Sequence, residues 1–186
     1  MPDPRVEPLR ESEWSDEVRA ILGPLEKAGG GRVLNIFATL AHHPDLMRRW
    51  LVFGNHVLGK STLPPRVREI AILRIGWLCR SAYEWGQHVI IARGLGMTDE
   101  EIARIAAGPD ADGWSEDEAL VLRATDELHA DARIADPTWE GLARHFDRRQ
   151  LMDLVFAVGQ YNLVSMALNS FGVVPDAGVP GFDETT

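Results

Sequence analysis

Helix start and stop signals recur along the chain and constrain its fold more than any other feature. Capping boxes, in which Ser, Thr or Asp is followed three residues later by Glu or Gln, begin at Thr98, Ser115 and Asp147. Proline, which suits the first helical position, marks further starts at Pro44, Pro64-Pro65 and Asp136-Pro137. Glycines that can adopt the left-handed cap conformation mark ends at Gly59, Gly94, Gly96, Gly108 and Gly172.

These signals predict an all-α fold. No segment shows the sustained alternation with β-branched residues that is typical of a strand, so we expect none. The predicted helices cover residues 13–22, 33–42, 44–58, 65–79, 81–95, 98–107, 115–130, 137–145 and 147–171.

The composition is that of one ordinary globular domain spanning residues 1–186. The chain is 45% hydrophobic and 25% charged, and a chain of this length can bury roughly 70% of its unfolded surface around a single core. The net charge of -9, with no basic run longer than a pair such as Arg148-Arg149, argues against nucleic acid and anionic membranes as partners.

Cysteine and histidine usage excludes several chemistries. Cys79 is the only cysteine, so the chain has no internal disulfide, no Cys-x-x-Cys pair and no thiolate-rich zinc site. His42, His43 and His56 lie close in sequence, but Pro44 interrupts the helix between them and adjacent histidines point about 100° apart. We therefore expect no metal and no cofactor.

The chain shows neither a secretory signal nor a run of about 20 apolar residues, which predicts a cytoplasmic protein without a membrane span. The Pro- and Gly-rich ends, residues 1–12 and 175–186, favour extended arms that can wrap a neighbouring subunit.

The strongest candidate site lies on the predicted helix 81–95. Ser81, Glu84 and His88 occupy positions i, i+3 and i+7 and share one narrow stripe, while the rest of the helix is largely apolar. A helix that is apolar almost all round is usually central. The stripe is therefore expected to face an internal cleft beside the helix N-terminus, where an acidic ligand is favoured.

Glu69 is a second unusual carboxylate, because it shares a helix face with Ile72, Leu73 and Gly76. Burial raises the pKa of an unpaired carboxyl, and such a group beside a histidine suits acid–base catalysis. The alternatives are a surface pair for Glu84 and His88, an ion pair with arginine for Glu69, and an N-cap role for Ser81.

The segments Arg68-Glu69-Ile-Ala-Ile-Leu and Ser81-Ala-Tyr-Glu84-Trp-Gly-Gln-His88 resemble the carboxymuconolactone decarboxylase superfamily, which includes the alkylhydroperoxidase D proteins. In the peroxidase branch the pattern is Glu, eleven residues, Cys-x-x-Cys, three residues, His. Its positions fall here on Glu69, Ser81, Glu84 and His88, so both cysteines are missing, and Cys79 lies two residues before the first of them. The decarboxylase branch carries Glu and His at the positions of Glu84 and His88.

The resemblance implies the helical alkylhydroperoxidase D-like fold, assembled as a homo-oligomer (dimer, trimer or hexamer) with pockets near subunit contacts. It divides the chain into residues 1–30 (arm and first helix), 31–130 (core), 131–173 (additional helices) and 174–186 (tail). The implied catalytic residues are His88, Glu84 and Glu69. The residues expected to bind substrate are Ser81, Tyr83, Trp85, His56 and Tyr161, with Trp77 and Asn162 as further pocket candidates, and all except Ser81 fit the core equally well.

The leading functional hypothesis is a cofactor-free lyase or isomerase acting on a small carboxylated lactone or related acid. His88 would donate or accept the proton, Glu84 would orient it, and Glu69 would act as a second acid–base group or hold an arginine. One alternative is a peroxidase that uses Cys79 alone, and another is a non-catalytic binding protein for a small molecule.

Overall fold

The computed structural model describes residues 4–182, and every regular element within them is a helix. The predicted all-α fold and single domain are therefore confirmed. The outer ends of the predicted arm and tail, residues 1–3 and 183–186, lie outside the described residues. The elements are η1 (Glu11–Glu13), α1 (Asp16–Ala28), α2 (Asn35–Leu40), α3 (Pro44–Gly59), α4 (Pro65–Leu78), α5 (Ala82–Gly94), α6 (Asp99–Ala107), α7 (Glu116–Asp131), α8 (Asp136–Leu142) and α9 (Arg148–Phe171).

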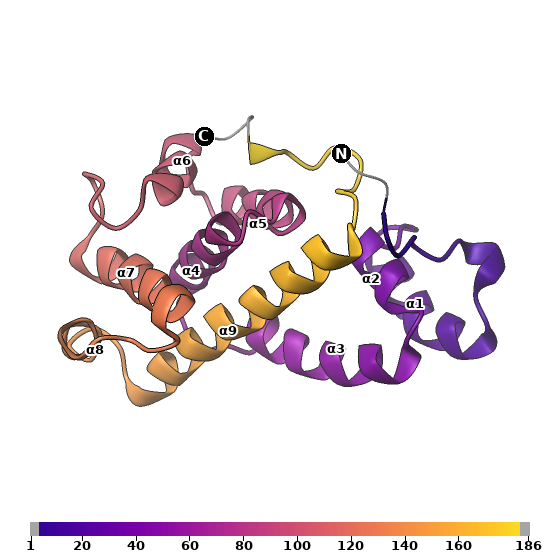
Figure 1. The fold of residues 1–186 in the computed structure, drawn as a ribbon, viewed down its shortest axis with the longest axis horizontal. Coiled ribbons are helices and arrows are strands. Elements are labelled where there is room, and N and C mark those ends of the chain that lie inside the picture. The colour runs from indigo at the N-terminus through magenta and orange to yellow at the C-terminus, as the bar shows by residue number, and fades with distance from the viewer. Residues whose placement is uncertain (1–3, 183–186) are drawn as a thin grey trace.

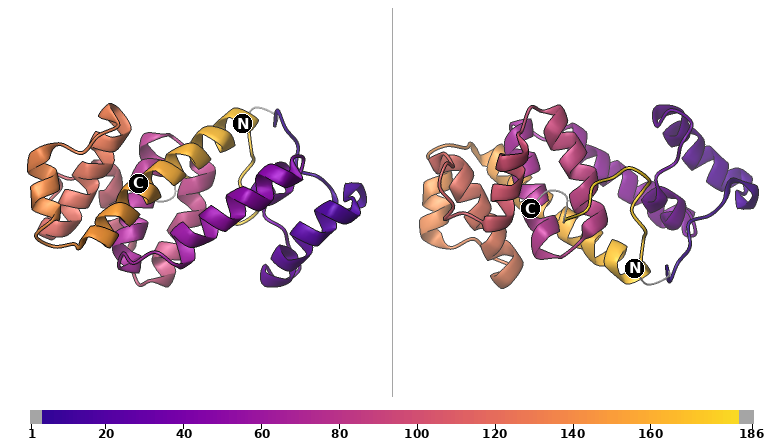
Figure 2. Two further views of the ribbon diagram at one scale, coloured as in Figure 1. Left: turned by 90° about the horizontal axis from the view of Figure 1, so that it is seen from below. Right: turned by 90° about the horizontal axis from the view of Figure 1, so that it is seen from above.

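Helix α4 lies at the centre of the larger core and packs against α5, α7 and α9 (Figure 1). The molecule is elongated, with α6, α7 and α8 at one end and α1 and α2 at the other (Figure 2). Helices α3 and α9 connect the two ends, and a second, smaller cluster around Leu22 and Met47 packs α1 against α3.

The sequences of α4 and α5 explain their central position. Ile70, Ile72, Leu73 and Ile75 of α4 are fully buried although they point in different directions around the helix. A helix that is apolar all round has to be enclosed by its neighbours. Any polar side chain on α4 or α5 is consequently carried into the interior, which is how the site is positioned.

The first helix was predicted wrongly, because it covers residues 16–28 instead of 13–22. Ser15 is the N-cap and accepts a hydrogen bond from the Val18 backbone N–H. The helix then continues through Pro24, which removes one backbone hydrogen bond. Leu25 packs against the smaller core beyond that point, so its burial offsets the lost bond. Helices α2 and α8 are also shorter than predicted.

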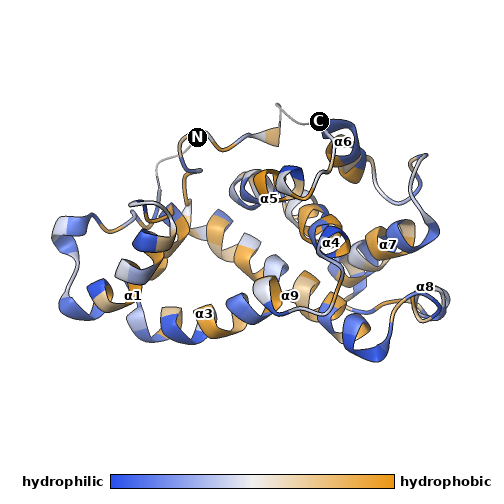
Figure 3. Cartoon of the chain, turned by 180° about the vertical axis from the view of Figure 1, so that it is seen from behind, coloured by the Kyte–Doolittle hydropathy of each residue, from blue (hydrophilic) through white to orange (hydrophobic). Residues whose placement is uncertain are grey.

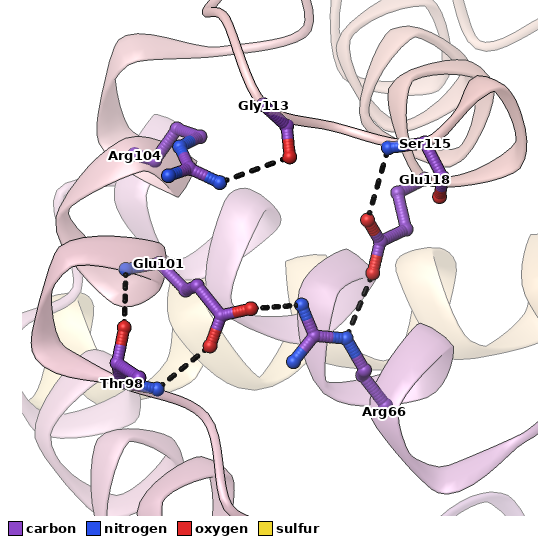
Figure 4. A network of polar contacts seen from close by, with 7 residues as sticks. All are labelled: Arg66, Thr98, Glu101, Arg104, Gly113, Ser115 and Glu118. Atoms are coloured by element: carbon purple, nitrogen blue, oxygen red, sulfur yellow. Dashed lines mark hydrogen bonds and ion pairs between the residues drawn. The ribbon is translucent and has the colours of Figure 1, made fainter.

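Arg66 connects the starts of α6 and α7 (Figure 4). Its guanidinium donates to Glu101 at 2.6 Å and to Glu118 at 2.7 Å. Each of these glutamates is the third residue of its helix and closes a capping box, with Thr98 and Ser115 respectively. The predicted capping boxes therefore do more than begin their helices, because one arginine of α4 binds both of them.

Helix α9 corrects the expectation that no segment is apolar enough to span a membrane. Of the helices within residues 4–182, it alone meets that test by length and composition, with a mean hydropathy of 1.4 over its most apolar stretch. Half of that stretch is buried inside the chain, and apolar residues recur along the helix (Figure 3). A core helix of a soluble protein meets the same test, so this composition by itself does not indicate a membrane span.

The residues that follow α9 fold back over α5 (Figure 1), and we call residues 173–182 the strap. A Cβ atom on Gly86 of α5 would lie 2.3 Å from the Pro180 carbonyl oxygen and 2.4 Å from Val179 Cγ1. Phe182 packs its ring on Trp77 and Trp85. The predicted arm thus packs on its own chain.

Candidate functional site

Helices α4 and α5 bring Glu69, Glu84 and His88 into direct contact, and we call these three residues the imidazole cluster. His88 Nδ1 lies 2.5 Å from Glu69 Oε2, and His88 Nε2 lies 3.0 Å from Glu84 Oε1. An ionised carboxylate only accepts hydrogen bonds, so both ring nitrogens must carry a hydrogen to bind both of them. The geometry therefore favours the imidazolium form of His88.

The imidazole cluster is enclosed by the core. Glu69 has no exposed surface, and the exposed fraction of Glu84 and of His88 is 4%. Arg68 Nε donates to Glu69 Oε1 at 3.2 Å, so Glu69 has both a histidine and an arginine as partners. Both readings of Glu69 from the sequence thus occur together: it is an ion-pair partner of an arginine and a neighbour of the histidine.

The pKa of His88 reflects two opposing effects. Burial lowers the pKa because it disfavours the charged ring. The hydrogen bonds and charges of Glu69 and Glu84 raise the pKa by a larger amount. The result is a pKa of about 9, well above the ordinary value of 6.5. His88 is therefore positively charged at neutral pH.

A cavity of about 160 Å³ opens beside the imidazole cluster, and we call it the polar cavity. Glu84 and His88 form part of its wall. The Tyr161 ring stands edge-on to the His88 ring, with 4.8 Å between their centroids. Burial, together with the carboxylates of Glu84 and Glu69, raises the pKa of Tyr161, so its hydroxyl stays protonated. The other polar residues that line the polar cavity are Asn55, Tyr83, Gln87 and Gln160.

A second polar cluster borders the same cavity where the strap meets α5, and we call Tyr83, Gln87 and Asp176 the strap cluster. Asp176 Oδ2 accepts from the Tyr83 hydroxyl at 2.6 Å and from Gln87 Nε2 at 2.9 Å. Asp176 Oδ1 accepts from the backbone N–H of Asn35, at the start of α2. Burial and this hydrogen bond to Asp176 raise the pKa of Tyr83. One aspartate therefore fastens the strap to two helices.

The remaining residues expected to bind substrate lie outside the cavity wall. Ser81 is the N-cap residue of α5, but its buried hydroxyl makes no hydrogen bond within the described residues. Trp85 is fully buried in the larger core against Trp77, and His56 is exposed on α3. Of the residues expected to bind substrate, Tyr83 and Tyr161 line the cavity.

Cys79 is half-buried at the end of α4 and lies outside the wall of the polar cavity. Its thiol donates to Asn162 Oδ1 at 3.0 Å, which places Asn162 with the cysteine and away from the cavity. Burial raises the pKa of Cys79. A raised pKa disfavours the thiolate, which is the reactive form of cysteine.

The sequence interpretation missed five residues of the site: Asn55, Arg68, Gln87, Gln160 and Asp176. Gln87 was visible as the neighbour of His88, and Arg68 as the neighbour of Glu69. Gln160 directly precedes Tyr161, which was singled out. Asp176 gave no signal, because it lies 93 residues from Tyr83 and depends on the path of the strap.

Within residues 4–182, no group of three or more His, Cys, Asp or Glu side chains is arranged to hold a metal ion. In the imidazole cluster the two carboxylates bind opposite sides of one ring and do not converge on a common point.

Residues 44–127 match the model of the carboxymuconolactone decarboxylase family. This range contains all three residues of the imidazole cluster. Among curated proteins, YdfG of Bacillus subtilis (strain 168), which has no characterised function, is 25% identical over 116 residues, covering 60% of this chain and 79% of that protein.

Solved structures support the same fold. A peroxidase-related protein with an alkylhydroperoxidase AhpD core, from Ralstonia eutropha JMP134, superposes with a TM-score of 0.81 at 20% identity, covering 95% of this chain and 94% of that one. A peroxidase-related protein from Silicibacter sp. TM1040 gives a TM-score of 0.78 at 17% identity, covering 89% and 87%. A Cys-to-Ala variant of the debrominase Bmp8, bound to 2,3,4-tribromopyrrole, gives 0.75 at 14% identity, covering 92% and 91%. At these identities the likeness shows the fold alone.

Proposed function

We propose that this chain, as a member of the carboxymuconolactone decarboxylase and alkylhydroperoxidase D-like superfamily that lacks the Cys-x-x-Cys pair, is a cofactor-free acid–base lyase or isomerase. The observation that carries the proposal is the position of Glu84. Its side chain lines the polar cavity while one of its oxygens binds a buried histidine. A carboxylate placed in this way can exchange a proton with a bound molecule.

The geometry supports a different division of roles from the one suggested by the sequence. Both nitrogens of His88 are bound by carboxylates, so neither faces the ligand freely. The second oxygen of Glu84, Oε2, makes no hydrogen bond within the described residues. Glu84 is therefore the group that contacts substrate, whereas His88 and Glu69 act as positioning residues that hold and neutralise it.

The reaction that fits is proton transfer at carbon next to a carbonyl group. In an isomerase, the Glu84 carboxylate removes a proton from that carbon, the electron pair moves into an enolate, and the same proton returns at another carbon. In a lyase, the enolate forms when a carboxylate of the substrate leaves as carbon dioxide. Glu84 takes a proton from His88 and passes it to the carbon, and His88 regains a proton from solvent. A small lactone meets the requirements of the isomerase, and a lactone that carries a carboxylate meets those of the lyase.

The proposal is tested with β,γ-unsaturated γ-lactones, whose double bond moves into conjugation by this proton transfer. Glu84→Gln keeps the shape and one hydrogen bond but cannot take up the proton. We expect its turnover to fall about 10²- to 10⁴-fold. The matched control is Glu140→Gln, an exposed glutamate of α8, which should behave as wild type. Equal turnover in wild type and Glu84→Gln would overturn the proposed role of Glu84.

The names of the two peroxidase-related structures make peroxide reduction the second candidate. In this chain the reaction would have to use Cys79, whose pKa is raised by burial and which lies away from the polar cavity. Consumption of an organic peroxide with a thiol donor, lost in Cys79→Ser and retained in Glu84→Gln, would establish that reaction instead. Binding of lactones without turnover or peroxide consumption would indicate a binding protein.

A homo-oligomer is also proposed, formed through a seam on α9. Met152, Phe156, Leu163 and Met166 are each half or more exposed, and together with exposed Gly159 they follow alternate steps of four and three residues. This spacing is the one by which two helices pair along a seam. Light scattering after size exclusion should show an oligomer for wild type and a monomer for Phe156→Glu. A monomeric wild type would contradict the proposal.

A further inference from the structure

A second cavity lies beside the polar cavity and differs from it in chemistry. This apolar cavity, of about 110 Å³, is lined by residues of α2, α3 and α9 and by Val173 at the start of the strap. Ile36, Trp50 and Val164 line both cavities, so the two share one wall. The other residues that line the apolar cavity are Thr39, Leu40, Leu46, Met47, Leu163, Ala167, Leu168 and Phe171.

The wall of the apolar cavity presents no polar surface. Thr39 carries the only side-chain hydroxyl among its lining residues, but Thr39 Oγ1 is buried away from the cavity. The cavity therefore suits a purely apolar group of a ligand.

The volumes of the two cavities set the size of the molecule that fits. An engineered apolar cavity of about 150 Å³ holds one benzene molecule. The polar cavity is of that order, and the apolar cavity is somewhat smaller. Each therefore accommodates a small ring or a short chain, and the pair accommodates a ring with an apolar substituent.

The charges around the polar cavity determine whether a charged or an uncharged ring can bind there. No lysine or arginine is among the described residues that line it. The positive charge of His88 is already matched by two carboxylates, and Glu84 itself faces the cavity. An ionised carboxylate on the substrate would therefore meet a like charge with no free cation to offset it.

We propose that the substrate is an uncharged lactone or enone ring that reacts in the polar cavity and carries an apolar tail seated in the apolar cavity. This proposal rests on the isomerase form of the proposed function and departs from the small acid expected from the sequence. The tail extends from the polar cavity past Ile36, Trp50 and Val164, the residues that line both cavities.

The test measures binding of saturated γ-lactones that carry a methyl, propyl, pentyl or heptyl group, because these rings do not undergo the isomerisation. Affinity should rise about fourfold per methylene, which corresponds to 0.8 kcal/mol, until the apolar cavity is full, and then stop rising. Ala167→Leu narrows this cavity, so the rise should end at a shorter tail. Ala130→Leu, at an exposed position of α7, is the matched control. Equal affinity for all four tails, or the same profile in Ala167→Leu and wild type, would overturn the proposal.

The same lactones separate this proposal from the proposed function. Tail-dependent binding that persists in Glu84→Gln, with no turnover in wild type, would overturn the proposed acid–base reaction but support the site for the apolar tail. Turnover of a short β,γ-unsaturated lactone, with no gain in affinity from a longer tail, would support the reaction but overturn the tail site.

Discussion

Two polar clusters border the same cavity from the same helix, and they differ in what their carboxylates hold. In the imidazole cluster, Glu69 and Glu84 bind a histidine whose charge can change. In the strap cluster, Asp176 binds a tyrosine hydroxyl and a neutral amide, and the pKa of that tyrosine is raised. The first arrangement can therefore release and take up a proton as the pH passes through about 9, whereas the second holds one segment against another. The two clusters are expected to respond differently to mutation and to pH.

The largest effect on stability is expected from Glu69→Ala. The substitution leaves buried His88 with one carboxylate in place of two and removes the partner of Arg68. Breaking a buried ion pair by removing one partner costs about 3–5 kcal/mol. Urea unfolding followed by circular dichroism measures this loss. Glu140→Ala, at an exposed position, is the control and should change the unfolding free energy little.

The pH dependence of stability should come next in size. The folded pKa of His88, about 9, lies above its ordinary value of 6.5, so this contribution is fully present below pH 6.5 and is lost as the pH rises through 9. The shift corresponds to a contribution on the order of 3 kcal/mol. Thermal melts of wild type between pH 6 and pH 10 should show Tm falling on the alkaline side. A His88→Gln variant with the same alkaline fall would show that another group is responsible.

Gly86→Ala perturbs the strap without touching a polar residue. The added methyl would lie 2.3 Å from the Pro180 carbonyl oxygen, so the strap has to move. Overpacking of this kind costs about 1–3 kcal/mol. Hydrogen exchange should become faster in residues 173–182. On the same helix, Gly94→Ala is the control, because nothing lies within 4 Å of its added methyl; equal exchange in both variants would contradict the packing described.

The smallest effect is expected from Asp176→Asn, which keeps one acceptor for Tyr83 but removes the charge that strengthens the bonds to Tyr83 and Gln87. A loss of about 1 kcal/mol is expected, measured by urea unfolding. The imidazole cluster should be unchanged, so the pKa of His88 followed by NMR should match wild type. A shift of that pKa would show that the two clusters are coupled.

The sequence predicted the fold and the imidazole cluster for identifiable physical reasons. Caps such as Thr98–Glu101 are local, and the i, i+4 spacing of Glu84 and His88 places them together on any helix. Glu69 could be predicted to lie with them because a carboxylate on an apolar helix face needs a buried partner. The contact between Glu69 and His88 depends on how α4 and α5 cross, which no local pattern specifies.

What the sequence could not predict depends on long-range packing. Trp85 and Tyr161 are both aromatic and both suited a pocket or a core, yet one faces the core and the other the polar cavity. The extended composition of residues 175–186 was recognised, but a composition cannot say which surface a segment covers. The end of α1 was predicted wrongly because Leu25 is buried by contacts with residues outside its own helix, which the local sequence does not show.

The contacts of Arg66 with Glu101 and Glu118 lie away from the polar cavity, but they affect the stability of the fold at acid pH. The hydrogen bond from Arg66 is the main cause that lowers the pKa of Glu101, so the stability from this pair is present above pH 4.5 and is lost as Glu101 takes up a proton. Acid therefore weakens the link between the starts of α6 and α7, while alkali discharges His88. The acid and the alkaline sides of the pH profile of stability are affected by different parts of the molecule.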